Sequence, residues 1–210
     1  LVAGVHFPAD ADPELIAQRA LRTNLSDLAA MGADPLWFTL ALTLPEANEE
    51  WLRRFSRGLF SCARDYGIAL VGGDTTSGPL SITIQVMGAT QAHQAMRRDG
   101  ANIGDFILVT NALGDGAAAL AAIQQTQSFA PEHRDYLLSR FYRPTPRLQE
   151  SALIRDMATS ALDISDGLVA DLQHICDASD VGAVIDVENI PLSPAVKALN
   201  NTSQAYQWAL

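Results

Sequence analysis

Short apolar runs of strand length alternate with amphipathic helical segments along the chain, and this alternation predicts a mixed α/β fold. Apolar residues recur at three- and four-residue steps over 13–32, which is typical of one long helix. A nearly continuous apolar run over 36–44 has the length of a strand, and an amphipathic helix is predicted over 48–66. Two further strands are predicted over 68–76 and 80–90, separated by a Ser-Gly-Pro turn.

The segment 91–104 is the best candidate for a domain junction. It loses the apolar periodicity and carries paired arginines and two glycines, whereas the sequence on either side is core-forming. We therefore predict an N-terminal α/β domain over 1–96 and a C-terminal α/β domain over 97–210.

Strand and helix patterns alternate again beyond this junction. A strand, a glycine turn and a helix are predicted over 105–123, followed by helices over 131–141 and 146–158. A short strand, a turn and a helix are predicted over 161–179, and a last strand over 182–187.

The composition excludes some classes of protein. With 48% hydrophobic residues, a chain of 210 residues can bury a substantial core. A net charge of -10 repels phosphate backbones, and no basic run outweighs it, so we predict no nucleic-acid partner. The same acidity suits either a protein that gathers divalent cations or one with an acidic surface, and charge alone does not separate the two.

Cysteine usage and hydropathy point to a protein without a membrane partner. Cys62 and Cys176 lie far apart without a C-x-x-C spacing, which favours buried free thiols over a zinc site or a disulfide. No apolar run reaches the roughly 18 to 20 residues of a membrane span, so we predict a cytoplasmic protein. The chain opens on Leu1 rather than Met and ends inside a helical pattern, so we expect truncation at both ends.

Asp27, in the segment "TNLSDLAAMGADP", is the first candidate for chemistry. Aspartate is a poor helix former, so a carboxylate within the long predicted helix needs a reason. It is either an exposed helix residue near Arg22 or a functional carboxylate, and the segment alone leaves both open.

A second candidate segment is "VGGDTTSG", in which an apolar strand runs into Gly72, Gly73 and Asp74. Glycines let the backbone approach a ligand closely, and a carboxylate at the end of a strand can hold a hard cation against phosphates. The alternative is a hairpin turn in which Asp74 bonds its own backbone. The segment is neither a Walker A loop nor a dinucleotide-binding fingerprint.

The third segment, "LDISDGL", places Asp163 at the end of a predicted strand and Ser165 and Asp166 before a helix. Ser165 or Asp166 could cap the helix, which stabilises a helix by about 1 kcal/mol. Capping does not explain Asp163, because aspartate is disfavoured in strands. Paired carboxylates beside free helix N-terminal amides can instead hold a metal and its phosphate together.

Three further positions have two readings each. Arg98 in the junction is either a phosphate contact or a solvated arginine. His6 is either a substrate contact or a histidine in a strand whose ring makes its hydrogen bonds within the protein. The glycines that flank Asp115 form either a phosphate-binding nest or, more simply, the start of a helix.

Taken together, "NLSDLAAMGADPLWFTLALTLP", "GGDTTSGPLSITIQVMG" and "DISDGLVADL" resemble consecutive signature segments of the thiamine-monophosphate kinase family. This family lies within the aminoimidazole ribonucleotide synthetase superfamily, and the similarity extends in order over nearly the whole chain. Three long segments are far more specific than any one of them.

The resemblance implies an ATP- and magnesium-dependent kinase that phosphorylates thiamine monophosphate to thiamine diphosphate. It implies that Asp27, Asp74, Asp163 and Asp166 serve magnesium ions, the first three of them as catalytic residues. It also implies ATP contacts for Gly73, Asp74, Arg98 and Ser165, and a thiamine monophosphate contact for His6.

The implied fold has two domains, with strands of the first domain building a barrel across a homodimer. The predicted strands of the first half look apolar on both faces, and closing a barrel with a partner covers such faces. We also expect Asp27, Asp74, Asp163 and Asp166 to converge on one magnesium-phosphate site, although they are far apart in the sequence.

The departures from the family matter as well. An acidic G-D-D segment and an S-T-D segment upstream, and a G-G-E-D-Y-E-L segment downstream, are absent from the sequence. The chain alone is therefore expected to be inactive for want of part of its site. The alternatives are another ATP-dependent synthetase of the superfamily and a truncated, non-catalytic nucleotide-binding or dimerisation module.

Overall fold

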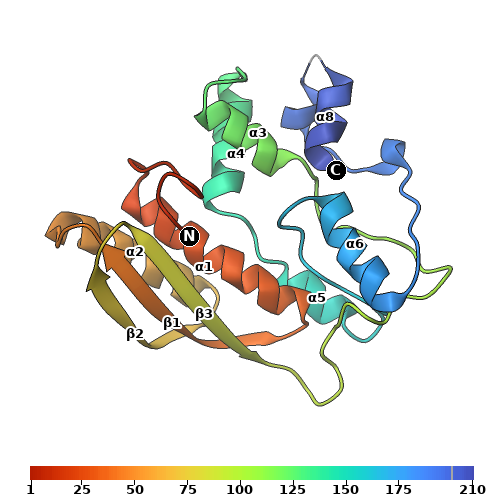
Figure 1. Cartoon of the computed structure of the whole chain (residues 1–210), viewed down its shortest axis with the longest axis horizontal. Coiled ribbons are helices and arrows are strands. Elements are labelled where there is room, and N and C mark those ends of the chain that lie inside the picture. The colour runs from red at the N-terminus through yellow and green to blue at the C-terminus, as the bar shows by residue number, and fades with distance from the viewer. Residues whose placement is uncertain (200) are drawn as a thin grey trace. The chain divides into compact units, whose positions relative to one another are not determined.

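A computed structural model of the chain describes residues 1–199 and 201–210 (Figure 1). The chain divides into two compact units. Unit 1 consists of Leu1–His93 and Tyr142–Leu148, and unit 2 consists of Gln94–Phe141 and Gln149–Leu210. The sequence pattern does not predict that Tyr142–Leu148 belongs to unit 1.

Unit 1 is built around a three-stranded sheet with the strand order β2-β1-β3. The strands are β1 (Asp34–Leu44), β2 (Ala69–Ser77) and β3 (Ser81–Ala89), in agreement with the predicted runs. β1 pairs with β2 in parallel and with β3 antiparallel. Although a turn joins β2 to β3, these two strands do not pair with each other, because β1 lies between them.

Two helices, α1 (Pro13–Ala30) and α2 (Glu49–Asp65), pack against each other and against one face of this sheet (Figure 1). Each begins at a side chain that accepts a hydrogen bond from an otherwise unpaired amide. Asp12 accepts from the Glu14 amide at 2.9 Å, and Asn48 accepts from the Trp51 amide at 2.9 Å. The core between helices and sheet includes Leu21, Leu25, Phe38, Phe55 and Leu59.

The other face of the sheet is open in unit 1. Phe38 and Leu42 are buried towards the helices, whereas the alternate residues Trp37 and Ala41 are exposed. The prediction that both faces are apolar is wrong, because most side chains around Trp37 on the open face are small or polar. They include Thr39, Ala41, Thr43, Thr83 and Gln85.

Both cysteines are buried free thiols, as the sequence predicts. Burial raises the pKa of the Cys62 thiol from its usual 9.0 to about 11. The native state therefore favours the protonated thiol. The contribution of the protonated Cys62 thiol to the free energy of unfolding is complete below about pH 9 and is lost as the pH rises through 11.

We expect iodoacetamide at pH 8 to leave Cys62 unmodified in the native protein and to alkylate it in urea, because the reactive thiolate is scarce and covered. Peptide mass spectrometry after a timed reaction checks this. Native labelling of Cys62 as fast as in urea would contradict its burial.

Unit 2 contains helices in the places where the sequence predicts them. α3 follows the glycine turn, α4 and α5 correspond to the next two predicted helices, and α6 follows the "DISDG" turn. Their bounds, with those of the last two α-helices, are α3 (Asp115–Ile123), α4 (Pro131–Tyr142), α5 (Leu148–Ile154), α6 (Leu168–Ser179), α7 (Pro194–Lys197) and α8 (Thr202–Ala209). A short 3-10 helix, η1, spans Val187–Asn189.

The strands predicted for the second half are wrong. Within the described residues of unit 2, the segments 105–111, 161–164 and 182–187 form no strand. A strand persists only where a neighbour completes its hydrogen bonds, and apolar strand residues also need a covered face. Phe106 is 93% exposed and Val184 is 92% exposed, so neither segment gains that cover.

None of the described helices is long and apolar enough to span a membrane.

Candidate functional site

The "VGGDTT" segment forms the middle of β2, the edge strand of the sheet in unit 1. Gly73 has a φ of +146°, and a Cβ at this position would lie 2.7 Å from the Leu40 carbonyl carbon. Only glycine fits there. Asp74 lies inside the strand, so both readings of it, as a residue at a strand end and as part of a hairpin turn, are wrong.

A β-bulge decides which way Asp74 faces. Phe38 pairs with Leu70, but the next residue, Thr39, pairs with Gly72, so one residue of β2 has no partner. The shift places Asp74 opposite the exposed Ala41. Side chains of directly paired residues point to the same face, so the Asp74 carboxylate is exposed on the open face of the sheet.

Asp27 lies near the end of α1, and its side chain is exposed. Its carbonyl accepts a hydrogen bond from the Met31 amide at 3.2 Å, where the helix ends. Arg22, the cation close to it in sequence, donates a hydrogen bond to the Tyr66 hydroxyl at 2.6 Å and lies 4.0 Å from Asp65.

Beside the "DISDG" turn of unit 2 lies a buried carboxylate that the sequence reasoning missed, that of Asp171 in the first turn of α6. The amides of Ser165, Asp166 and Gly167 all donate to Asp171 Oδ2, at 2.8, 3.0 and 3.2 Å. Asp163 is half-buried, whereas the side chains of Ser165 and Asp166 are exposed. The prediction of free amides at the N-terminus of the helix is wrong for two of them, because the Gly167 amide donates to Asp171 and the Val169 amide donates to the Leu210 carbonyl at 2.8 Å.

The capping explanation for this turn is also wrong. The residue at the N-cap of α6 is Gly167, and no side chain caps the helix there. Ser165 and Asp166 lie before the helix, with side chains that do not satisfy its amides. An acidic residue in the first turn of α6, four residues after a Ser-Asp-Gly turn, is the sequence signal that points to Asp171.

Arg98 and His6 lie in irregular segments, and the backbone of each residue is hydrogen-bonded. The carbonyl of Arg98 accepts hydrogen bonds from Ser160 Oγ at 3.0 Å and Ser179 Oγ at 2.9 Å, and its side chain is exposed. His6 lies in a turn rather than in a strand, and its Nδ1 accepts a hydrogen bond from the Val2 amide at 3.0 Å. The ring proton is therefore on Nε2.

The helix-start reading of the glycine turn around Asp115 is confirmed. Gly114 is the N-cap of α3 with a φ of +86°, and Asp115 is its first residue. Asp115 Oδ2 accepts hydrogen bonds from the Tyr136 hydroxyl at 2.7 Å and from Arg140 Nε at 3.3 Å. These bonds tie α3 to α4.

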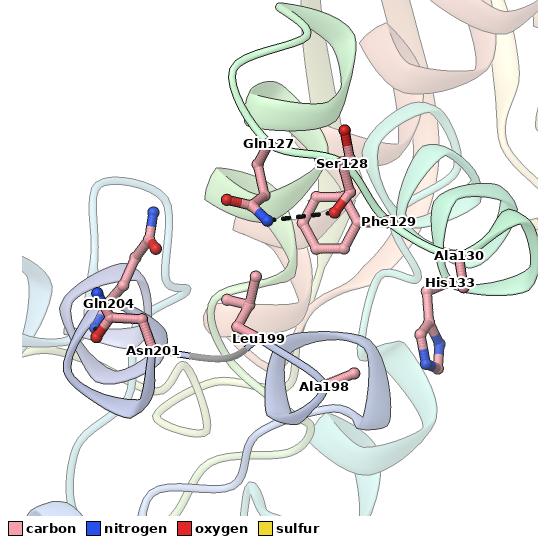
Figure 2. A pocket seen from close by; sticks show the side chains of 9 residues that line it. All are labelled: Gln127, Ser128, Phe129, Ala130, His133, Ala198, Leu199, Asn201 and Gln204. Atoms are coloured by element: carbon pink, nitrogen blue, oxygen red, sulfur yellow. Dashed lines mark hydrogen bonds between the residues drawn. The ribbon is translucent and has the colours of Figure 1, made fainter.

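A pocket of about 330 Å³ lies elsewhere in unit 2 (Figure 2). Its lining includes the amide side chains of Gln127, Asn201 and Gln204 and the imidazole of His133. The Gln127 side chain donates a hydrogen bond to the Ser128 carbonyl at 3.2 Å. The pocket has no residue in common with the positions that the sequence singles out.

The candidate carboxylates belong to both units. Asp27 and Asp74 lie in unit 1, and Asp163 and Asp166 lie in unit 2. Among the described residues, no three His, Cys, Asp or Glu side chains are grouped closely enough to hold a metal ion by themselves. That the four carboxylates meet at one site stays a prediction.

Comparison with known proteins shows which family the chain resembles. The N-terminal domain of AIR synthase related protein matches residues 1–90, and its C-terminal domain matches residues 102–206. Thiamine-monophosphate kinase of Salmonella typhimurium is 50% identical over 211 residues, which cover 100% of this chain and 65% of that protein. The crystal structure of thiamine-monophosphate kinase from Stenotrophomonas maltophilia superimposes with a TM-score of 0.95 at 45% identity. The match covers 100% of this chain and 68% of that one.

The chain belongs to the thiamine-monophosphate kinase family. A further family structure, described as AaThiL complexed with AMPPCP and TMP, gives a TM-score of 0.92 at 33% identity. It is covered over 69% of its length and covers 100% of this chain. The two-domain fold of the family is confirmed, whereas this chain spans only 65% of the length of its curated thiamine-monophosphate kinase relatives.

Proposed function

We propose that the protein transfers the γ-phosphoryl group of ATP to the phosphate of thiamine monophosphate, giving thiamine diphosphate and ADP. The observation that carries the proposal is the 50% identity to thiamine-monophosphate kinases over the whole chain. A relative with 33% identity was solved with AMPPCP, an ATP analogue, and TMP. The same comparison favours a kinase over other ATP-dependent synthetases of the superfamily.

The four candidate carboxylates have the right chemistry for magnesium. Mg²⁺ prefers oxygen ligands and is usually held by one or two carboxylates together with substrate phosphates and water. Asp74 and Asp27 are exposed in unit 1, and one turn of unit 2 carries the exposed Asp166 and the half-buried Asp163. We assign these four residues to the magnesium ions, which neutralise the charge of the ATP phosphates when bound.

The remaining residues have roles that follow from their placement. The space that a Cβ would take at Gly73 is filled by the Leu40 backbone, so the assignment of Gly73 to ATP follows from its place next to Asp74 in β2. The exposed Arg98 guanidinium presents a planar fork of donors that matches a phosphate, and the exposed Ser165 hydroxyl can donate to one. We assign Gly73, Asp74, Arg98 and Ser165 to ATP.

His6 is assigned to the acceptor substrate. Its Nδ1 is held by the Val2 amide, which orients the ring and leaves the Nε2 proton to donate to the phosphate of thiamine monophosphate. During transfer, an acceptor phosphate oxygen attacks the γ-phosphorus while the bond to the β–γ bridging oxygen breaks. Both reactants are anionic, so positioning and charge neutralisation supply most of the catalysis.

The proposal is tested by incubating the full natural protein with ATP, Mg²⁺ and thiamine monophosphate and measuring thiamine diphosphate by chromatography. Stoichiometric formation of ADP and thiamine diphosphate is expected. Nucleotide binding without product, measured on the same sample, would favour a non-catalytic nucleotide-binding module. A parallel sample without Mg²⁺ is expected to form no product.

A homodimer formed through the part of the open face around Trp37, four residues along β1 from the Ala41 that pairs with Asp74, belongs to the same proposal. Trp37 is 50% exposed on that face, a large apolar surface for a position inside a strand. We expect Trp37→Glu to convert the dimer into a monomer in light scattering at micromolar concentration. Phe60, which is 45% exposed on α2, provides the matched control, and Phe60→Glu should leave the dimer intact. A wild-type protein that is only monomeric would contradict the proposal.

The cytoplasmic location predicted from the sequence stays a prediction.

A further inference from the structure

Asp171 is buried and accepts three backbone hydrogen bonds, which its position in an amphipathic helix does not require. Its side chain is almost fully buried, with 4% of the residue exposed. One carboxylate oxygen, Oδ2, accepts hydrogen bonds from three consecutive amides, those of Ser165, Asp166 and Gly167. Consecutive amides that converge in this way form a nest for an anion, and here the anion is a side chain of the same unit.

We propose that Asp171 is a positioning residue for the nucleotide site, and this inference rests on the function proposed above. Asp171 is buried and therefore contacts neither ATP nor magnesium directly. It acts through Ser165 and Asp166, whose backbones it holds and whose side chains remain exposed. The ligand-facing groups are thus fixed before the nucleotide arrives.

The bonds to Asp171 also decide how the turn contacts phosphate. The three amides of the turn already donate to Asp171. Phosphate binding at this turn therefore depends on the Ser165 hydroxyl and on cations held by Asp166. Charge-assisted hydrogen bonds are about twice as strong as neutral ones, so a neutral Asn at position 171 would hold the turn less firmly. Residues that orient ligating side chains typically change metal affinity or activity by about 10- to 100-fold when replaced.

Asp115 provides a matched control for loss of a buried charge. It lies in the same unit, is also 4% exposed, and accepts hydrogen bonds in the first turn of a helix. Its partners are Tyr136 and Arg140 on α4, not the "DISDG" turn. Asp171→Asn and Asp115→Asn therefore remove the same charge at equal burial, but only the first touches the proposed nucleotide site.

The experiment compares these two variants in the full natural protein. Titration with a non-hydrolysable ATP analogue and Mg²⁺ should show about 10- to 100-fold weaker binding for Asp171→Asn, and a change of less than about threefold for Asp115→Asn. The KM for ATP should rise in the same way, while the KM for thiamine monophosphate stays within about threefold of wild type. A purely structural role would lower the folded fraction without separating the two KM values.

Hydrogen–deuterium exchange of the 165–167 amides gives a second readout that does not depend on the kinase activity. These amides should exchange faster in Asp171→Asn than in wild type, and at the wild-type rate in Asp115→Asn. Unchanged exchange, or nucleotide affinity within threefold of wild type, would overturn the role of Asp171. Failure of wild type to form thiamine diphosphate would instead count against the proposed function.

Discussion

Replacing Asp74 with Asn in the full natural protein is expected to lower kcat by about 100-fold or more at every concentration of thiamine monophosphate. Asp74 presents an exposed carboxylate on the open face of the edge strand β2. Asn has nearly the same shape and β-strand fit, but it lacks the charge that holds a cation near the transferring phosphoryl group. Removing one group that stabilises developing charge typically costs about 10²- to 10³-fold in kcat.

Steady-state kinetics with saturating ATP check this result, with two variants for comparison. Asp65→Asn removes another exposed carboxylate of unit 1, at the end of α2, and should leave kcat unchanged. His6→Ala should raise the KM for thiamine monophosphate by about 10- to 100-fold and barely change that for ATP, because a charge-assisted hydrogen bond contributes about 1.5–3 kcal/mol. If Asp74→Asn and His6→Ala gave the same kinetic pattern, the division of roles between them would be wrong.

Gly58→Ala is expected to destabilise unit 1 by about 1–3 kcal/mol, although alanine is the better helix former. Gly58 is buried in α2, where α2 crosses α1. A Cβ at this position would lie 2.8 Å from the Glu14 Cα and closer still to the Glu14 carbonyl oxygen. Both atoms belong to the backbone of α1, so no change of rotamer relieves the overlap and the helices must separate.

Urea denaturation followed by circular dichroism measures this effect, and Gly116→Ala serves as the control. Gly116 is exposed in α3, and a Cβ there would meet nothing within 4 Å. The same change should therefore stabilise that helix by about 0.4–1 kcal/mol. A Gly58→Ala protein with an unchanged or higher midpoint would show that α1 and α2 tolerate a wider separation than their packing indicates.

Local periodicity was enough to predict the elements of unit 1. α1, α2 and the three strands lie where the apolar spacing places them, because each covers one face of a shared core. Periodicity failed for the strands of unit 2, such as 105–111 and 182–187. An apolar run becomes a strand only when a neighbour pairs with it, and pairing is a non-local property that the run itself does not carry.

The sequence by itself determined the α/β class, the helices and the family, since these depend on local pattern and on long signature segments. Only the tertiary structure decided towards which surface or neighbour the side chain of each candidate residue points. Without the bulge in β2, Asp74 would pair with the buried Leu42 and point towards the core, and one residue of register moves it to the open face. The role of Asp171 likewise depends on a turn that folds back over α6 and brings three amides to one oxygen. Register and chain reversal are set by contacts between segments, so no spacing within one segment reveals them.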